Sequence, residues 1–241
     1  MFNTPRKAAT IAVIRDSDES PSKLEVLLMK RGKTDKFLPL YYVFPGGAVD
    51  EQDYSDIAGY SPSIYPNVTG DERNSLFVHL NAAIRETFEE SGILLANDKS
   101  GQIPDLTDPQ VHLRFHEYRE RIFRREMDFL DMLNAEKLEP AYERLYYISR
   151  HITPVFLPIR YDARFFVAIC PGNQHVLHDG DELVETACLS PEEALAMHKR
   201  GRMKMVQPTV ETLKLLSRFN SISHAMEYFA GKESSSPLSG F

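Results

Sequence analysis

The segment Arg-Glu-Thr-Phe-Glu-Glu-Ser-Gly-Ile, from Arg85 to Ile93, gathers acidic side chains at helical spacing. Glu86, Glu89 and Glu90 are separated by steps that bring their carboxylates together over about one turn of a helix. Three carboxylates at such close range repel one another unless a cation lies between them. Mg²⁺ prefers carboxylate, water and phosphate oxygens as ligands. The pattern therefore predicts a metal site that acts on a phosphorylated substrate.

A solvated helix face is the alternative interpretation. Arg85 lies one helical turn before Glu89 and would simply pair with it there. Taken alone, the E-x-x-E-E pattern is more typical of such a surface. The feature that favours a metal site is the pair Gly46 and Gly47, which follows a short apolar stretch. This pair predicts a turn in which the missing Cβ lets the backbone approach a ligand closely.

Together these features resemble the signature of the Nudix hydrolase family, G-x5-E-x7-R-E-U-x-E-E-x-G-U, in which U is a bulky aliphatic residue. Its second half matches Arg85, Glu86, Glu89, Glu90, Gly92 and Ile93, with Thr87 at the first U position. Gly47 matches the first glycine if about 24 residues are inserted, at about 54–77. The insertion leaves the first acidic residue of the signature open between three candidates, Asp50, Glu51 and Asp53.

Further segments resemble the branch of this family that carries a long insertion in its signature, to which the peroxisomal coenzyme A diphosphatases of animals belong. The resemblance covers roughly residues 8–216. It rests on the segments 26–31, 37–39, 43–50, 152–154, 160–166, 189–195 and 207–209. It implies an α/β fold, with a mixed sheet between helices and the signature as a loop–helix–loop. It also implies an added helical segment at about 108–148. The chain length suits one domain over residues 1–230, and the serine-rich residues 231–241 are predicted to form a flexible tail.

The resemblance assigns roles to the signature residues. It implies Mg²⁺ or Mn²⁺ as the cofactor, held at the residues Gly47, Glu86, Glu89 and Glu90. Glu89 and Glu90 are the surest ligands, and Glu86 either joins them or acts as the general base. Arg85 orients a carboxylate of the signature. A late acidic residue is a further candidate for the base or an extra ligand, with Glu182 and Glu185 as the nearest choices.

By the same resemblance, the substrate is a small nucleotide with a diphosphate bridge. Coenzyme A and its esters are the leading candidates, and their cleavage gives 3′,5′-ADP and a phosphopantetheine. ADP-ribose, NADH and nucleotide sugars are alternatives, and a nucleotide-sensing module without catalysis is an alternative function. The candidate substrate-binding residues are Arg31, Gly46, Gly47, Arg160 and Arg164. A guanidinium suits phosphate, although Arg31 and Arg164 equally suit structural ion pairs.

Composition limits the possible partners. The chain has 241 residues, of which 42% are hydrophobic and 26% charged, as in ordinary globular domains. Its net charge of −7 argues against nucleic acid as a partner. We identify no signal peptide, and two cysteines make no disulfide framework, so we expect a cytoplasmic protein. No apolar stretch approaches the roughly 20 residues that span a bilayer, so no membrane partner is expected. A homodimer is compatible with the fold.

Hydrophobic patterns predict the elements that must position these residues. Strands are predicted at 10–14, 24–29, 41–44, 148–157 and 165–170. Helices are predicted at 74–91, where Gly92 provides the stop, and at 192–198, 209–216 and 223–229. Residues 108–148 also show helical spacing and carry five arginines between 114 and 125. We predict a solvated face for these arginines, with one or two that reach an anionic substrate as the alternative.

Overall fold

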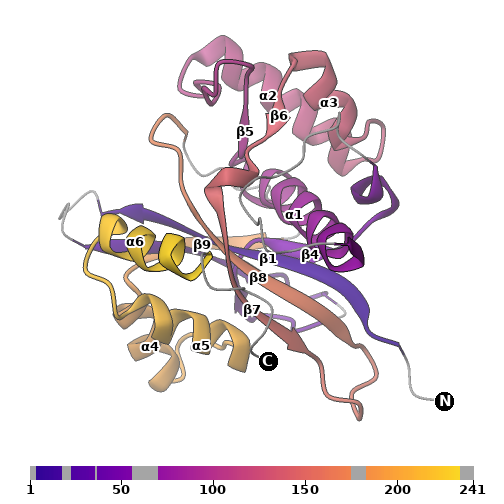
Figure 1. Cartoon of the computed structure of the whole chain (residues 1–241). Coiled ribbons are helices and arrows are strands. Elements are labelled where there is room, and N and C mark those ends of the chain that lie inside the picture. The colour runs from indigo at the N-terminus through magenta and orange to yellow at the C-terminus, as the bar shows by residue number, and fades with distance from the viewer. Residues whose placement is uncertain (1–3, 18–22, 36, 56–69, 175–182, 234–241) are drawn as a thin grey trace.

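The computed structural model describes residues 4–17, 23–35, 37–55, 70–174 and 183–233, which form a mixed sheet between two layers of helices (Figure 1). On one face lies α1 (Gly70–Ser91), with α2 (Pro109–Phe123) and α3 (Phe129–Glu136) beyond it. The helices on the other face are α4 (Pro191–Lys199), α5 (Gln207–Leu216) and α6 (Ile222–Glu233). This arrangement confirms the α/β fold expected from the sequence.

The sheet of the described residues has the strand order β3-β2-β1-β8-β7, with β4 paired to β1 and β9 paired to β2. Only β1 and β8 run parallel among these pairs. The strands are β1 (Arg6–Asp16), β2 (Leu24–Arg31), β3 (Tyr42–Val43), β4 (Gly46–Ala48), β7 (Leu145–Ile152), β8 (Tyr161–Ile169) and β9 (Leu183–Leu189). The short strand β4 therefore runs alongside the start of the central strand β1, next to α1.

The central strand β1 is buried on both faces. Ile11 and Val13 belong to the core beneath α1, whereas Ala12 and Ile14 belong to the core beneath α5 and α6. A strand covered on both sides carries an almost continuous apolar run, because neither face meets water. This run is the segment at 10–14 from which the strand was predicted.

Helix α1 presents its apolar side to the sheet and its acidic side to a cavity. Leu80, Ile84 and Phe88 are fully buried in the core beneath it. The helix ends where Gly92 adopts a left-handed conformation, with φ of 73°, which glycine tolerates without strain. The helix predicted at 74–91 is confirmed, and it begins four residues earlier, at Gly70.

The prediction of a continuous helical segment at 108–148 was wrong in part. Asp108 caps α2 and Pro109 occupies its first turn, as expected. The chain then breaks at Arg125 and Lys137, which both have left-handed φ values of 56°. After α3 come β6 (Glu139–Pro140), which pairs with β5 (Ala96–Asn97), and the strand β7. The strand predicted at 148–157 accordingly begins and ends earlier than expected, at 145–152.

The three C-terminal helices confirm the predictions at 192–198, 209–216 and 223–229. Helix α4 begins with a capping box between Ser190 and Glu193, which satisfies backbone N–H groups at its start. Strand β9 was not predicted, because its sequence Leu-Val-Glu-Thr-Ala-Cys-Leu shows no regular alternation of apolar and polar residues. Within the described residues, no helix has both the length and the apolarity that crossing a membrane requires. Most of the tail predicted at 231–241 lies outside the described residues, and α6 continues to Glu233.

Candidate active site

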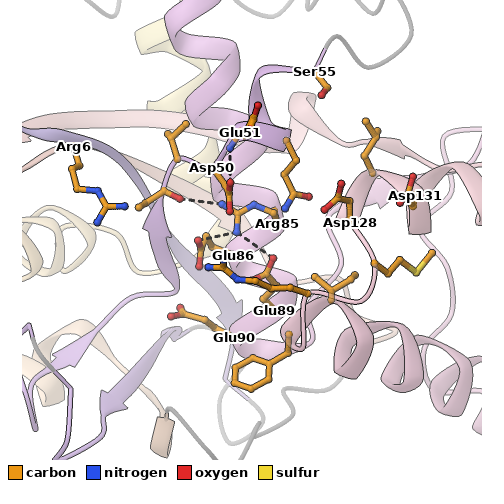
Figure 2. Close-up of a pocket in the computed structure, with 18 residues that line it drawn as sticks. Arg6, Asp50, Glu51, Ser55, Arg85, Glu86, Glu89, Glu90, Asp128 and Asp131 are labelled. Carbon is orange, nitrogen blue, oxygen red and sulfur yellow. Dashed lines mark hydrogen bonds and ion pairs between the residues drawn. The ribbon is translucent and has the colours of Figure 1, made fainter.

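A cavity of about 880 Å³ lies between α1, the turn after β4 and the helical lobe of α2 and α3 (Figure 2). Its acidic lining residues are Asp50, Glu51, Glu86, Glu89, Glu90, Asp128 and Asp131. Its basic lining residues are Arg6, Arg85 and Arg125. We call this space the acidic cavity. Its excess of carboxylates over guanidinium groups makes it a place where a cation is electrostatically favoured.

Arg85 is the organising side chain of the acidic cavity. Its Nε and Nη2 donate to the two carboxylate oxygens of Asp53 at 3.0 and 2.9 Å. Its Nη1 donates to Oε1 of Glu86 at 2.9 Å and to Oε1 of Glu89 at 3.1 Å. Its Nη2 also donates to the carbonyl oxygen of Ala48 at 3.0 Å. Figure 2 shows the bonds to Glu86 and Glu89 converging on this guanidinium at the wall of the cavity.

Asp53, of the three candidates for the first acidic residue of the signature, is the partner of Arg85. It lies in the single-turn helix Glu51–Tyr54, where its side chain also accepts a hydrogen bond from the backbone N–H of Asp50 at 2.7 Å. Asn81 of α1 donates to the Asp53 carbonyl oxygen at 2.8 Å. Asp50 and Glu51, in contrast, are exposed at the cavity. The turn after β4 is thus tied to α1 across the long insertion.

Two glycines allow β4 to lie against α1 and β1. A Cβ on Gly46 would lie 2.3 Å from the carbonyl oxygen of Ala9, and its φ of 153° is one that other residues rarely adopt. A Cβ on Gly47 would lie 2.5 Å from Oε1 of Glu86. The backbone N–H of Gly46 donates to Oε2 of Glu90 at 2.8 Å. The glycine turn predicted from the sequence therefore brings a backbone strand into contact with the carboxylates of α1.

The carboxylates of α1 are held in partly dehydrated positions. Burial raises the pKa of Glu86 to about 7; the positive charge of Arg85 opposes this rise, and the negative charge of Glu89 adds to it. Burial also raises the pKa of Glu89, again against the influence of Arg85. Both shifts arise chiefly from burial, which the charge of Arg85 does not fully offset. A divalent cation would favour the charged forms of both groups.

The donor chemistry of the acidic cavity fits a hard divalent cation, because carboxylate oxygens are the preferred ligands of Mg²⁺ and Mn²⁺. In the part of the chain that the structure describes, no three Asp, Glu, His or Cys side chains converge tightly enough to hold a metal ion. Arg85 engages Glu86 and Glu89, and Gly46 engages Glu90. Cation binding would exchange these hydrogen bonds for metal contacts.

The arginines of the helical lobe have different roles. Arg119 is buried and donates to the backbone carbonyl oxygens of Glu89 and Glu90, both at 2.8 Å. These carbonyls lie in the last turn of α1, where no further helical N–H reaches them. Arg125 is the one of the five that lines the acidic cavity. Residue type and spacing alone did not reveal the role of Arg119, although the unpaired carbonyls before Gly92 required some donor.

A second cavity of about 590 Å³ lies on the other side of β4, between the sheet and α5. Its lining is mostly apolar and includes Phe37, Phe44 and Phe165. We call it the apolar cavity. Gly46 and Gly47 line it, so β4 forms part of its wall and lies between it and the acidic residues of α1. Of the arginines predicted to bind substrate, it contains Arg31 alone, which forms an ion pair with Asp35 at 3.1 Å.

Arg160, Arg164 and Glu185 line neither of these two cavities. Arg160 donates to the carbonyl oxygen of Thr153 at 3.1 Å. This hydrogen bond stabilises the connection between β7 and β8. Arg164 is buried beneath α1, where it donates to Oγ of Ser75 at 3.2 Å. Glu185 forms an ion pair with Lys30 at 3.0 Å across β2 and β9. Glu182, the other late acidic candidate, lies outside the described residues.

A mixed sheet between helices, with an Arg-Glu-x-x-Glu-Glu helix facing a glycine strand, defines a Nudix hydrolase. The model of one Nudix family, described as the NUDT19 Nudix domain, matches residues 72–216. This match covers more than half of the chain, so the chain belongs to the NUDT19 Nudix-domain family. The matched region begins in α1 and therefore includes Arg85 and the three glutamates, but not the glycine turn or Asp53.

Curated relatives and a solved structure agree with this assignment. The acyl-coenzyme A diphosphatase NUDT19 of Xenopus laevis is 27% identical over 251 residues, covering 90% of this chain and 66% of the relative. Its counterpart in Gallus gallus is also 27% identical and covers 90% of this chain and 69% of the relative. The chain thus spans about two thirds of these relatives. The crystal structure of a Nudix hydrolase from Alicyclobacillus acidocaldarius is 29% identical, with a TM-score of 0.75, and the match covers 94% of this chain and 97% of that one.

Proposed function

We propose that this chain is a metal-dependent diphosphatase that hydrolyses the diphosphate bridge of coenzyme A or an acyl-coenzyme A. The products are 3′,5′-ADP and a phosphopantetheine or its acyl thioester. The observation that carries the proposal is that the acidic cavity and the apolar cavity lie on either side of β4, with Ala48 in the lining of both. A substrate with a charged bridge and a long organic arm requires such a pair of environments. The similarity to acyl-coenzyme A diphosphatases supports the same substrate class.

Glu86, Glu89 and Glu90 are the residues that would hold the cation, Mg²⁺ or Mn²⁺, with the backbone of Gly47 beside them. When bound, the cation supplies neutralisation of the diphosphate charge and activation of a water molecule. Phosphoryl transfer depends mainly on positioning and electrostatic stabilisation, so the protein itself need not form a covalent bond to the substrate. Glu86 either completes the ligand set or acts as the general base.

Arg85 positions the carboxylates rather than the substrate. All three of its guanidinium nitrogens already donate to protein oxygens, and the residue is only 4% exposed. Its bond to Asp53 anchors it to the turn after β4, so the positions of Glu86 and Glu89 depend on that turn. The arginines available to a phosphate group are instead Arg6 and Arg125, which are exposed and line the acidic cavity.

The apolar cavity would receive the organic part of the substrate. Gly46 and Gly47 line it, so the backbone of β4 forms part of its wall. Aromatic rings such as Phe44 and Phe165 provide flat apolar surface there. ADP-ribose, NADH and nucleotide sugars also combine a diphosphate bridge with a larger group, and they are the competing substrates.

The test is a panel of diphosphate compounds, incubated with the protein and either Mg²⁺ or Mn²⁺, with products identified by mass. We expect 3′,5′-ADP from coenzyme A and from acetyl-coenzyme A. Hydrolysis of ADP-ribose without hydrolysis of coenzyme A would reject the proposed substrate. Tight nucleotide binding in calorimetry, with no product at any metal concentration, would instead identify a sensing module without catalysis.

A further inference from the structure

Arg125 is the cationic side chain that the helical lobe contributes to the acidic cavity. It lies on the connection between α2 and α3 and is exposed. Two other arginines of this lobe form ion pairs at 2.9 Å, Arg114 with Glu136 and Arg124 with Glu120. Arg125 forms no ion pair or side-chain hydrogen bond within the part of the chain that the structure describes. Its guanidinium is therefore free to bind an anionic group inside the cavity.

The backbone at Arg125 has a conformation that glycine would adopt more readily. Its φ is 56°, and its N–H donates to the carbonyl oxygen of Ile122 at 2.8 Å, while the N–H of Glu126 donates to that of Arg121 at 2.9 Å. These two bonds define a Schellman motif, whose left-handed residue is usually glycine because a Cβ is strained there. Helix α4 ends in the same motif with Gly201 at this position, at φ of 71°. An arginine here therefore lowers stability, and side chains held in such conformations are concentrated at ligand-binding sites.

Contacts on two sides fix the α2–α3 connection beside the carboxylate helix. Arg119 joins α2 to the last turn of α1. At the start of α3, the backbone N–H of Phe129 donates to Oε1 of Gln52, on the turn after β4, at 3.0 Å. The ring of Phe129 also packs against that of Phe88 of α1, with 5.8 Å between centroids. Arg125 is thus carried by a rigid support, which reduces the entropy lost when its side chain binds a ligand.

A diphosphate bridge brings further negative charge into a cavity that is already acidic. The glutamates proposed to hold the cation lie on α1, at one side of the cavity. On the lobe side, Asp128 and Asp131 would repel the bridge, and Arg125 supplies the opposite charge. Figure 2 shows Arg6, the other exposed arginine of the cavity, at the end away from Asp128 and Asp131. Among the described residues, Arg125 is therefore the donor suited to phosphate oxygens that face the lobe.

We propose that Arg125 binds the phosphate oxygens of the diphosphate bridge from the lobe side and stabilises the negative charge that develops as the bridge breaks. The inference rests on the proposed function and adds a catalytic residue to it. In the reaction, a water oxygen bonds to one phosphorus while that phosphorus releases the bridging oxygen. The bridging oxygen keeps the electron pair of the broken bond and leaves with the second phosphate, and the water gives up a proton to the general base. Arg125 donates its N–H groups to the departing phosphate and offsets its charge.

The experiment measures the midpoint of thermal unfolding, Tm, and kcat/KM of Arg125→Gly. The substrate is coenzyme A, or the diphosphate compound of the panel that the wild type cleaves fastest. Glycine removes the strain of the left-handed position, so Tm rises by about 1–4 °C. Loss of the charge-assisted bonds lowers kcat/KM at least about tenfold. Arg125→Gln keeps a Cβ, so it shows the loss of kcat/KM without the rise in Tm.

Lys137 provides the matched control. It occupies the left-handed position of the same motif at the end of α3, also with φ of 56°, and the N–H of Leu138 donates to the carbonyl oxygen of Leu133 at 2.9 Å. Lys137 is exposed and lines neither the acidic nor the apolar cavity. Lys137→Gly should therefore raise Tm as Arg125→Gly does and keep the wild-type kcat/KM.

The outcomes separate the inference from the proposed function. If the wild type cleaves no compound of the panel, the proposed function itself fails. Wild-type kcat/KM in Arg125→Gly or Arg125→Gln would leave the proposed function intact and overturn the inference. An equal loss of kcat/KM in Lys137→Gly would assign the effect to the backbone of the lobe. A lower Tm in both Arg125 variants would assign the residue to folding, and either result would also overturn the inference.

Discussion

Arg85 and Asp53 form a bidentate ion pair that joins α1 to the turn after β4, with N–O distances of 3.0 and 2.9 Å. The exposed fractions of the two residues are 4% and 3%. Replacement of Asp53 by Asn leaves the Arg85 charge buried without its main partner, which costs about 3–5 kcal/mol of unfolding free energy. Chemical denaturation measures this loss. Asp131→Asn, in the exposed wall of the same cavity, is the control and changes stability by less than about 0.5 kcal/mol. Equal stability of the two variants would contradict a structural role for the pair.

Gly47 is the place where β4 meets the carboxylate of Glu86. In Gly47→Ala, the new Cβ would lie 2.5 Å from Oε1 of Glu86, so the side chain must move away from β4. We expect kcat/KM to fall at least about tenfold, since displacement of a catalytic group by about 1 Å can cost a hundredfold. Gly172→Ala is the control, because a Cβ there would have no neighbour within 4 Å. A Gly47→Ala enzyme with wild-type kcat/KM would show that the contact is unimportant.

The sequence predicted the carboxylate helix because helical periodicity is local: the positions of Glu86, Glu89 and Glu90 follow from their spacing. It named Asp53 as a candidate but did not choose it over Asp50 and Glu51, because the inserted segment separates these residues from Arg85 and a spacing rule no longer applies. Nor did it distinguish Arg164, buried beneath α1, from an arginine that lines a cavity. The side chain is the same in both cases, and only the tertiary packing decides where it lies.

Arg119 ties the helical lobe to the end of α1 through the carbonyl oxygens of Glu89 and Glu90. Arg119→Gln removes two charge-assisted hydrogen bonds, each worth roughly 1.5–3 kcal/mol, and we expect a loss of about 2–4 kcal/mol in unfolding free energy. The change is measured by urea denaturation beside Arg121→Gln, whose side chain is exposed on the same helix. A loss no larger than that of the control would show that the lobe does not depend on Arg119.

His79 makes the stability of the fold depend on pH. It is buried on α1, which lowers its pKa to about 4, from an ordinary value of about 6.5. Because its pKa is lower in the folded protein, His79 binds a proton more readily in the unfolded chain. The contribution of the neutral, buried His79 to the free energy of unfolding is therefore complete above about pH 6.5. It is lost as pH falls towards 4, by up to about 3 kcal/mol. His79→Gln should flatten the dependence of unfolding free energy on pH in this window. His116→Gln, exposed on α2, should leave it as in the wild type.

The central claim is that Glu86, Glu89 and Glu90 hold the cation of a diphosphate hydrolase. The most direct test is the steady-state hydrolysis of coenzyme A by Glu89→Gln and Glu90→Gln at increasing Mg²⁺ or Mn²⁺ concentrations, with circular dichroism to verify the fold. Loss of a charged ligand should reduce kcat by about a hundredfold or more, with the fold retained. Wild-type turnover in either folded variant would contradict the role of that carboxylate in metal binding.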